Sequence, residues 1–279
     1  MFEKSKPAFR GWAHPGPVPP ANVELDVGES LDHIGGHWCI FQYKKGHRFS
    51  TDDVLCAWYG SQWAPRVETY CDLGSGIGSV AFFVAWRLPG ADVVTLEAQE
   101  RSFRLQEKSI RYNGVEERFT QVLGDLREPE KLLKKAPFDL VTGSPPYWDE
   151  GDALASAYAQ AVSARLEIRG GIAEYAKTAA AILAPGGVFA TVFPDVQDER
   201  VQDALVAAGL KLIRSRAVRF KEGVDSTVSG LRLYLAGRAH DLPDDFVTFV
   251  EPPLTIRCEN GKVHPEYSAI KLSFGFPPG

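Results

Sequence analysis

The sequence lacks a long apolar run. No stretch approaches the roughly 18 to 20 uncharged apolar residues that a membrane-spanning helix needs. The first ten residues carry Lys4, Lys6 and Arg10 and lead into no apolar stretch, as a secretion signal would require. We therefore expect an unprocessed cytosolic protein that makes no use of a membrane.

The sequence also has few cysteines. The four that it has are widely spaced and form no CxxC pair: Cys39, Cys56, Cys71 and Cys258. This spacing excludes a short disulfide framework, and we expect reduced residues that lie mostly in the core. Imaginable metal ligands are Asp32, His33, His37 and Cys39. Because Gly35-Gly36 interrupts any helix that would place the two histidines on one face, we expect no metal.

An excess of positive charge is absent as well. The chain has 31 Lys and Arg against 36 Asp and Glu, a formal net charge of -5. It therefore lacks the overall positive field of many nucleic-acid-binding proteins, and contact with RNA would need local patches. Basic residues gather in two sets, either solvated surface or phosphate contacts near a pocket: Lys44, Lys45, His47 and Arg48, and Lys211, Arg214, Arg216, Arg219 and Lys221.

With no internal repeat, the chain divides by composition into three parts. Residues 1–28 are a proline-rich arm. Residues 29–66 predict a strand, a loop and a helix capped by Thr51 or Asp52, together forming a cap segment over a cofactor. Residues 67–279 alternate apolar strands with amphipathic helices, which predicts an α/β Rossmann-like fold with seven mostly parallel strands and helices on both faces. The expected strands are 67–73, 92–97, 119–123, 138–142, 187–193, 210–220 and 231–236, and the expected helices 79–87, 100–113, 172–183 and 198–208.

A glycine-rich loop follows the first strand of this domain. It reads Cys71-Asp72-Leu73-Gly74-Ser75-Gly76-Ile77-Gly78, so the spacing is DxGxGxG and the dinucleotide fingerprint GxGxxG is not met in full. Asp72 would repel a pyrophosphate but suits the cationic amino-acid part of S-adenosylmethionine (SAM). Glu97 closes the second strand, where a carboxylate accepts both hydroxyls of a ribose, and Asp125 follows the third, where it can accept from an adenine amino group. Acids at three consecutive strand ends favour SAM over the alternative of a tight turn with helix caps.

A second motif, Ser144-Pro145-Pro146-Tyr147-Trp148, follows the fourth strand. Two prolines fix the backbone, so the Ser144 hydroxyl and the Pro145 carbonyl form a rigid pair of acceptors for the two hydrogens of a planar amino group. Tyr147 then stacks on the ring that carries this group, and Trp148 walls the pocket. The alternative is a proline-stiffened turn. Residues 149–171, directly after the motif, are long and alanine-rich and are a candidate lid.

These motifs resemble those of class I SAM methyltransferases with an N/D/S-P-P-Y/F motif. More narrowly, the chain is similar to the bacterial tRNA adenine-N6 methyltransferases that modify valine tRNA beside its anticodon. The resemblance extends to Glu29-Ser30-Leu31-Asp32 and the stretch 46–52 near the start, and to Pro253-Leu254-Thr255-Ile256-Arg257 near the end. Ser144 departs from the asparagine usual in this family, and S-P-P-Y also resembles cytosine-N4 methyltransferases.

The resemblance implies roles for particular residues. Ser144 to Tyr147 would hold the adenine amino group, and the Thr51-Asp52 segment would lie over the methionine end of SAM. The full set expected to bind SAM is Phe49, Thr51, Asp52, Asp72, Gly74, Ser75, Gly76, Gly78, Glu97, Ala98, Asp125, Leu126 and Ser144. The leading hypothesis is therefore a tRNA adenine-N6 methyltransferase, with local basic patches contacting the RNA. Alternatives are methylation of cytosine N4 or of a protein glutamine amide, and a non-catalytic binding module; the oligomeric state stays open.

Overall fold

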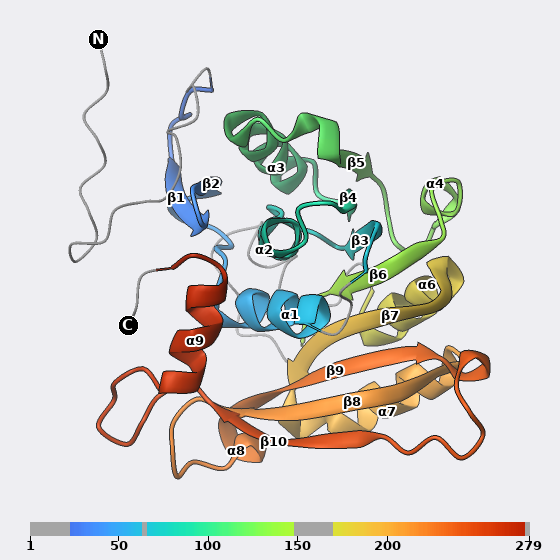
Figure 1. The fold of residues 1–279 in the computed structure, drawn as a ribbon. Helices are drawn as coiled ribbons and strands as arrows, with labels where there is room; N and C mark the ends of the chain where they lie inside the picture. Colours follow the sequence, from blue (N-terminus) through green and yellow to red (C-terminus); the bar gives the residue numbers. More distant parts are fainter. Residues whose placement is uncertain (1–22, 63–65, 148–169, 277–279) are drawn as a thin grey trace.

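The computed structural model describes residues 23–62, 66–147 and 170–276 (Figure 1). Its strands are β1 (Glu29–Gly35), β2 (Trp38–Tyr43), β3 (Thr69–Leu73), β4 (Asp92–Glu97), β5 (Phe119–Leu123), β6 (Phe138–Gly143), β7 (Leu183–Pro194), β8 (Leu210–Arg219), β9 (Gly230–Arg238) and β10 (Phe249–Thr255). The longer helices are α1 (Thr51–Gln62), α2 (Ser79–Arg87), α3 (Glu100–Asn113), α6 (Ile172–Ile182), α7 (Asp198–Ala207) and α9 (Pro265–Ser273). Short helical turns are η1 (Glu116–Arg118), α4 (Glu130–Leu133), η3 (Asp195–Gln197), α8 (Ser226–Ser229) and η4 (Ala239–Asp241).

The main sheet has eight strands in the order β10-β8-β9-β7-β6-β3-β4-β5, where seven were predicted. The additional strand is β10, which pairs in parallel with β8 at the edge of the sheet. Its sequence contains Pro252 and Pro253. Proline is tolerated in strands mainly at sheet edges, which is where β10 lies. The two prolines made the segment look unlike a strand in the sequence. β1 and β2 form a separate antiparallel pair.

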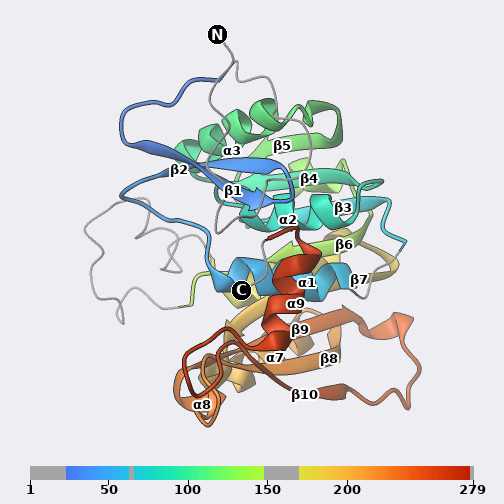
Figure 2. The same ribbon diagram turned by 60° about the vertical axis from the view of Figure 1, so that its left-hand side comes forward.

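The sheet separates two hydrophobic cores, as expected for a class I SAM-methyltransferase fold. Tyr70 and Val93 belong to the core shared with α1, α2 and α3, whereas Cys71 and Val94 belong to the core shared with α6 and α7. Successive strand residues point to opposite faces, so both faces of this sheet are apolar and covered (Figures 1 and 2). The prediction of an α/β fold with helices on both faces is confirmed.

Most predicted elements of this domain are found with small shifts at their ends. The predicted helices over 79–87 and 100–113 coincide with α2 and α3, and the left-handed cap expected at Gly114 is present with φ 64°. Trp58, expected in the core, is buried, and so are Cys39, Cys56 and Cys71; all four cysteines are free. Trp148, most of the candidate lid and most of the proline-rich arm lie outside the described residues. Within residues 23–62, 66–147 and 170–276, no helix is long and apolar enough to cross a membrane.

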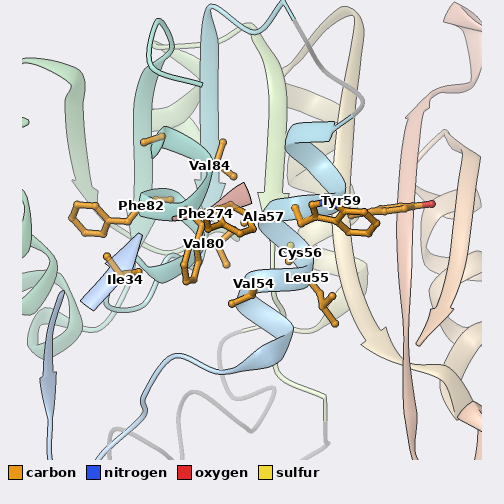
Figure 3. Close-up of a cluster of buried hydrophobic side chains, with 14 of the residues drawn as sticks. Ile34, Val54, Leu55, Cys56, Ala57, Tyr59, Val80, Phe82, Val84 and Phe274 are labelled. Carbon is orange, nitrogen blue, oxygen red and sulfur yellow. The ribbon is translucent and has the colours of Figure 1, made fainter. Parts of the chain in front are cut away.

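Helix α1 packs into the core more deeply than a cap segment suggests. Cys56, Ala57 and Tyr59 are fully buried in α1, which packs beside α2 against the sheet (Figure 3). The two residues predicted to cap this helix, Thr51 and Asp52, lie one and two positions too late. The helix begins at Thr51, so Ser50 occupies the N-cap position, and the Ser50 N–H donates to the Asp53 carboxylate at 2.8 Å. This is one half of a capping box, with Asp53 in place of the usual glutamate.

Candidate active site

A cavity of about 660 Å³ opens at the carboxyl ends of β3, β4, β5 and β6. Its volume lies in the range of small-molecule sites. Predicted site residues supply much of its lining: Phe49, Asp52, Asp72, Gly74, Ser75, Gly76, Glu97, Ala98, Asp125, Leu126, Ser144, Pro145, Pro146 and Tyr147. The glycine loop and the Ser-Pro-Pro-Tyr segment, about 70 residues apart, therefore share one cavity.

Two predicted residues do not line this cavity. Thr51 is directed to the side of α9, where its side chain hydrogen-bonds to Tyr267. Gly78 forms the N-cap of α2 with φ 89°, and a methyl group added there would lie 2.8 Å from the Gln106 side chain. Gly78 therefore shapes the turn into α2 and leaves contact with the cavity to Gly74 and Gly76.

Gly74 is required by the close approach of an aromatic ring. It has φ 59°, and a Cβ built on it would lie 1.9 Å from the Tyr175 hydroxyl. Tyr175, on α6, also packs against Gly143, where an added Cβ would lie 2.5 Å from its ring. Gly76 also has positive φ, at 57°, but nothing lies within 4 Å of the corresponding position. Tyr175, which the sequence analysis missed, thus forms the floor of the cavity between the two motifs.

Asp72 lies at the end of β3 and is 1% exposed. Its Oδ1 accepts a hydrogen bond from the Thr142 hydroxyl at 2.6 Å, and Thr142 in turn accepts from the Tyr70 hydroxyl at 2.7 Å. Its Oδ2 is buried and has no hydrogen-bond partner among the described residues. Burial, with repulsion from Glu97, raises the pKa of Asp72 to about 7. A buried carboxylate oxygen without a donor, on the wall of a cavity, fits a cationic ligand group.

Glu97 and Asp125 line the cavity but already accept other hydrogen bonds. The backbone N–H groups of Gly76 and Gln99 donate to the two oxygens of Glu97 at 2.7 and 2.6 Å. Arg127 binds both oxygens of Asp125, with its Nη2 2.6 Å from Oδ2. Both carboxylates nevertheless line the cavity at the strand ends where the ribose and the adenine of SAM were predicted to bind.

Polar contacts hold the segment that contains Arg48 and Phe49 over the cavity. Gln42 is fully buried, and its side chain accepts from the Phe49 N–H at 2.9 Å and donates to Asp32 at 3.0 Å. Arg48, at the cavity mouth, donates to the same Asp32 oxygen at 2.9 Å. Asp32, once considered as a metal ligand, therefore anchors the loop. Asp53, which the sequence analysis also missed, is buried in the cavity wall, and burial followed by repulsion from Asp52 raises its pKa well above the usual value.

Tyr147 is held at several points. Its hydroxyl donates to Asp52 Oδ2 at 2.9 Å, and its ring packs edge to face with Phe193 at a centroid distance of 5.2 Å. Burial and the neighbouring Asp52 raise the pKa of Tyr147 well above the ordinary value, so the hydroxyl keeps its proton at neutral pH. The ring is therefore placed beside Ser144 and Pro145 before any substrate binds.

The two basic sets have different surroundings. His47 and Arg48 of the first set line the cavity mouth. In the second set, Arg214 pairs with Glu251 and Arg216 with Glu266, and both guanidinium groups are largely buried. Those two arginines fit neither interpretation of that set, because they are too buried for solvated surface and are paired with carboxylates.

A family comparison matches residues 62–199 to the model described as "Methyltransferase small domain". This match covers just under half of the chain. Together with the α/β architecture, it gives the protein the domain and the fold of a SAM-dependent methyltransferase.

The relatives differ in how much of the chain they match. The chain is 27% identical to the tRNA1(Val) (adenine(37)-N6)-methyltransferase of Porphyromonas gingivalis, over 81% of this chain and 88% of that protein. The release factor glutamine methyltransferase of Geobacter sulfurreducens is 34% identical, over only 32% of this chain and 30% of its own length. A crystal structure of a predicted O-methyltransferase from Agrobacterium tumefaciens shares the fold, with a TM-score of 0.58 at 17% identity over 80% of this chain and 96% of that one. The resemblance to the tRNA1(Val) methyltransferase family is confirmed.

Proposed function

We propose that this protein transfers the methyl group of SAM to the exocyclic amino group of an adenine in tRNA. The observation that carries the proposal is the shared cavity: the acid-flanked glycine loop and the Ser144–Tyr147 segment line the same space. The match to an adenine-N6 methyltransferase over most of both chains supports adenine over a glutamine amide, because the glutamine methyltransferase matches only about a third of this chain.

The cofactor end of the cavity suits a cationic nucleoside. Asp72 Oδ2 is the buried acceptor for the ammonium group of the methionine part, Glu97 for the ribose hydroxyls and Asp125 for the adenine amino group. SAM, when bound, would supply a methyl group on a sulfonium centre. Asp52 and Phe49 would cover this end from the segment before α1.

The other end of the cavity suits a planar amine. The Ser144 hydroxyl and the Pro145 carbonyl would accept the two hydrogens of the amino group, and Tyr147 would contact the ring. An aromatic amine is a weak nucleophile because its lone pair is delocalised, so orientation supplies much of the rate enhancement. An adenine in folded RNA must be unstacked to enter.

Mass spectrometry of nucleosides tests the proposal. The protein is incubated with labelled SAM and total bacterial tRNA, and the digested RNA is expected to contain labelled N6-methyladenosine. Labelled N4-methylcytidine, or label only in protein glutamine, would replace the proposed acceptor. Binding of SAM without transfer to any acceptor would indicate a non-catalytic module.

Ser144→Ala tests the role of the acceptor segment. Without the hydroxyl, transfer should fall at least a hundredfold, whereas the dissociation constant of S-adenosylhomocysteine should change less than threefold, an estimate that takes the loss of one oriented hydrogen bond in the transition state as about 3 kcal/mol. Ser273→Ala is a matched control, because Ser273 is exposed on α9 and lies outside the cavity. Equal loss of transfer and cofactor binding would mean that Ser144 is structural.

A further inference from the structure

Gln197 is a residue to which the sequence motifs assign no role. It ends η3, directly after β7, and its Nε2 donates a hydrogen bond to the backbone carbonyl oxygen of Tyr147 at 3.0 Å. The two residues are 50 positions apart in the chain. This contact ties the last residue of the Ser-Pro-Pro-Tyr segment to the end of the neighbouring strand.

The orientation of the Gln197 amide is defined by its two partners. Arg200 Nη1 donates to Gln197 Oε1 at 3.0 Å, and a guanidinium group can only donate. The Tyr147 carbonyl can only accept. The amide oxygen must therefore face Arg200 and the amide nitrogen must face Tyr147, so the side chain has one favourable orientation.

The backbone on both sides of Gln197 is anchored to the sheet. Arg232, on β9, places its Nε 2.6 Å from the Asp195 carboxylate and 3.6 Å from that of Asp198. Asp195 is 3% exposed, and its pair with Arg232 is shielded from solvent. Gln197 lies between these two carboxylates in the sequence, and its side chain therefore extends from a fixed point.

The acceptor segment is thus attached at both ends. At its start, Gly143 is in register with Leu73 of β3 and Thr191 of β7. In the middle, Pro145 and Pro146 have restricted backbone torsions. At its end, the direction of the Tyr147 carbonyl is set by Gln197. Holding this carbonyl restrains the ψ torsion of Tyr147.

We propose that Gln197 is a positioning residue for the acceptor site, and that Arg200 orients its amide for this task. The inference rests on the proposed function, because the segment that Gln197 holds is the one proposed to bind the planar amino group. Gln197 acts through Tyr147 and does not itself line the cavity among the described residues.

Two substitutions separate the hydrogen bond from the space that Gln197 fills. Gln197→Glu sets a carboxylate against the Tyr147 carbonyl, two acceptors face to face, while the contact with Arg200 is kept. Gln197→Met keeps the length and removes both polar groups. The control is Asn260→Asp, at an exposed amide outside the cavity whose oxygen accepts from the Lys262 N–H at 3.0 Å, because it makes the same chemical change and keeps that contact.

Kinetics with acceptor RNA give the first measurement. We expect kcat/KM to fall at least tenfold in Gln197→Glu and several-fold in both Gln197→Met and Arg200→Met. The dissociation constant of S-adenosylhomocysteine should stay within twofold of the wild-type value in each variant, and Asn260→Asp should match wild type. Loss of cofactor binding in parallel with transfer would overturn the proposal, since it marks a general structural role.

Hydrogen exchange gives a second measurement that needs no acceptor. The peptide that contains Ser144 to Tyr147 should exchange faster in the two Gln197 variants and at the wild-type rate in Asn260→Asp. If the wild-type protein methylates no RNA, the proposed function fails and this measurement alone decides the role of Gln197. Unchanged exchange in both Gln197 variants, or unchanged transfer despite faster exchange, would overturn the proposal.

Discussion

The Tyr147 hydroxyl donates a hydrogen bond to Asp52 Oδ2 at 2.9 Å, across 95 positions of the sequence. Asp52 belongs to the first turn of α1, and Tyr147 ends the acceptor segment. The contact joins the segment before the sheet to the motif that follows β6. The position of the aromatic ring at the acceptor end therefore depends on the segment that covers the cofactor end.

Tyr147→Phe is expected to lower kcat/KM for the acceptor by about ten- to a hundredfold, because a hydrogen bond to a charged group contributes about 1.5–3 kcal/mol. The ring remains, so its contact with Phe193 is kept. Steady-state kinetics of methyl transfer measure the effect. Tyr43→Phe on β2, outside the cavity, serves as the control, and equal activity of the two variants would contradict the prediction.

The affinity for SAM should depend on pH through Asp72. Burial raises the pKa of this carboxyl to about 7, so it is charged above that pH and neutral below it. A cationic ligand that needs the charged form binds fully above pH 7, and its affinity falls by up to about tenfold for each pH unit below. Calorimetry between pH 6 and 8 measures this slope.

5′-Methylthioadenosine is the matched control ligand, because it lacks both the ammonium group and the sulfonium charge. Its affinity should be nearly constant over the same range. A parallel fall for both ligands would place the titrating group elsewhere.

Asp72→Asn should stabilise the protein while abolishing tight cofactor binding. The carboxyl has a higher pKa in the folded state than the ordinary 3.8, so its contribution to stability is lost as pH rises from about 4 to about 7. Removing the charge should therefore raise the free energy of unfolding at pH 8, by between about 1 and 4 kcal/mol. At pH 4, well below the folded-state pKa and close to the ordinary value of 3.8, most of the gain should vanish. Urea denaturation at the two pH values checks the sign, and a larger gain at pH 4 would refute it.

Gly74→Ala and Gly76→Ala form a matched pair. Both glycines have positive φ, so each alanine should cost about 1–2 kcal/mol of backbone strain. Only at Gly74 does the new methyl group overlap Tyr175, which adds about 1–3 kcal/mol. Denaturant unfolding should therefore find Gly74→Ala the less stable variant, and equal stabilities would mean that Tyr175 moves aside freely.

Local sequence patterns predicted the central strands because each is a short apolar run bounded by turn residues. Helix α3 was predictable because its polar and apolar residues alternate with a helical period. An acid also stands at each of three strand ends. β10 was missed because its two prolines resemble a loop and only its edge position permits them. Ser50 was missed as a cap because Thr51 and Asp52, equally good capping residues, follow it directly.

Site residues were predictable where one short motif contains them. Tyr175, Asp53 and Gln197 were not, because each reaches the site from an element that carries no motif of its own. Gly74 did contain a signal: a glycine with positive φ is needed where another group approaches closely. The sequence could not reveal that this group is a tyrosine about 100 residues later. Long-range contacts of this kind depend on how strands are ordered, and no local pattern encodes that order.

Helix α9 follows the sheet in the sequence but packs near α1, α2 and the β1–β2 pair, which come from the N-terminal part of the chain. The carbonyl of Phe274 accepts a hydrogen bond from Gly36 at 2.7 Å, and its ring, fully buried, packs against Phe83 of α2 (Figures 2 and 3). Tyr267 of the same helix bonds to Thr51, at the start of α1. During synthesis, which releases the N-terminal part first, the wall around Phe49 to Asp53 therefore gains this support only after α9 has left the ribosome. The strands β3 to β6 can pair before that point, but the binding cavity is fully supported only once α9 has been made.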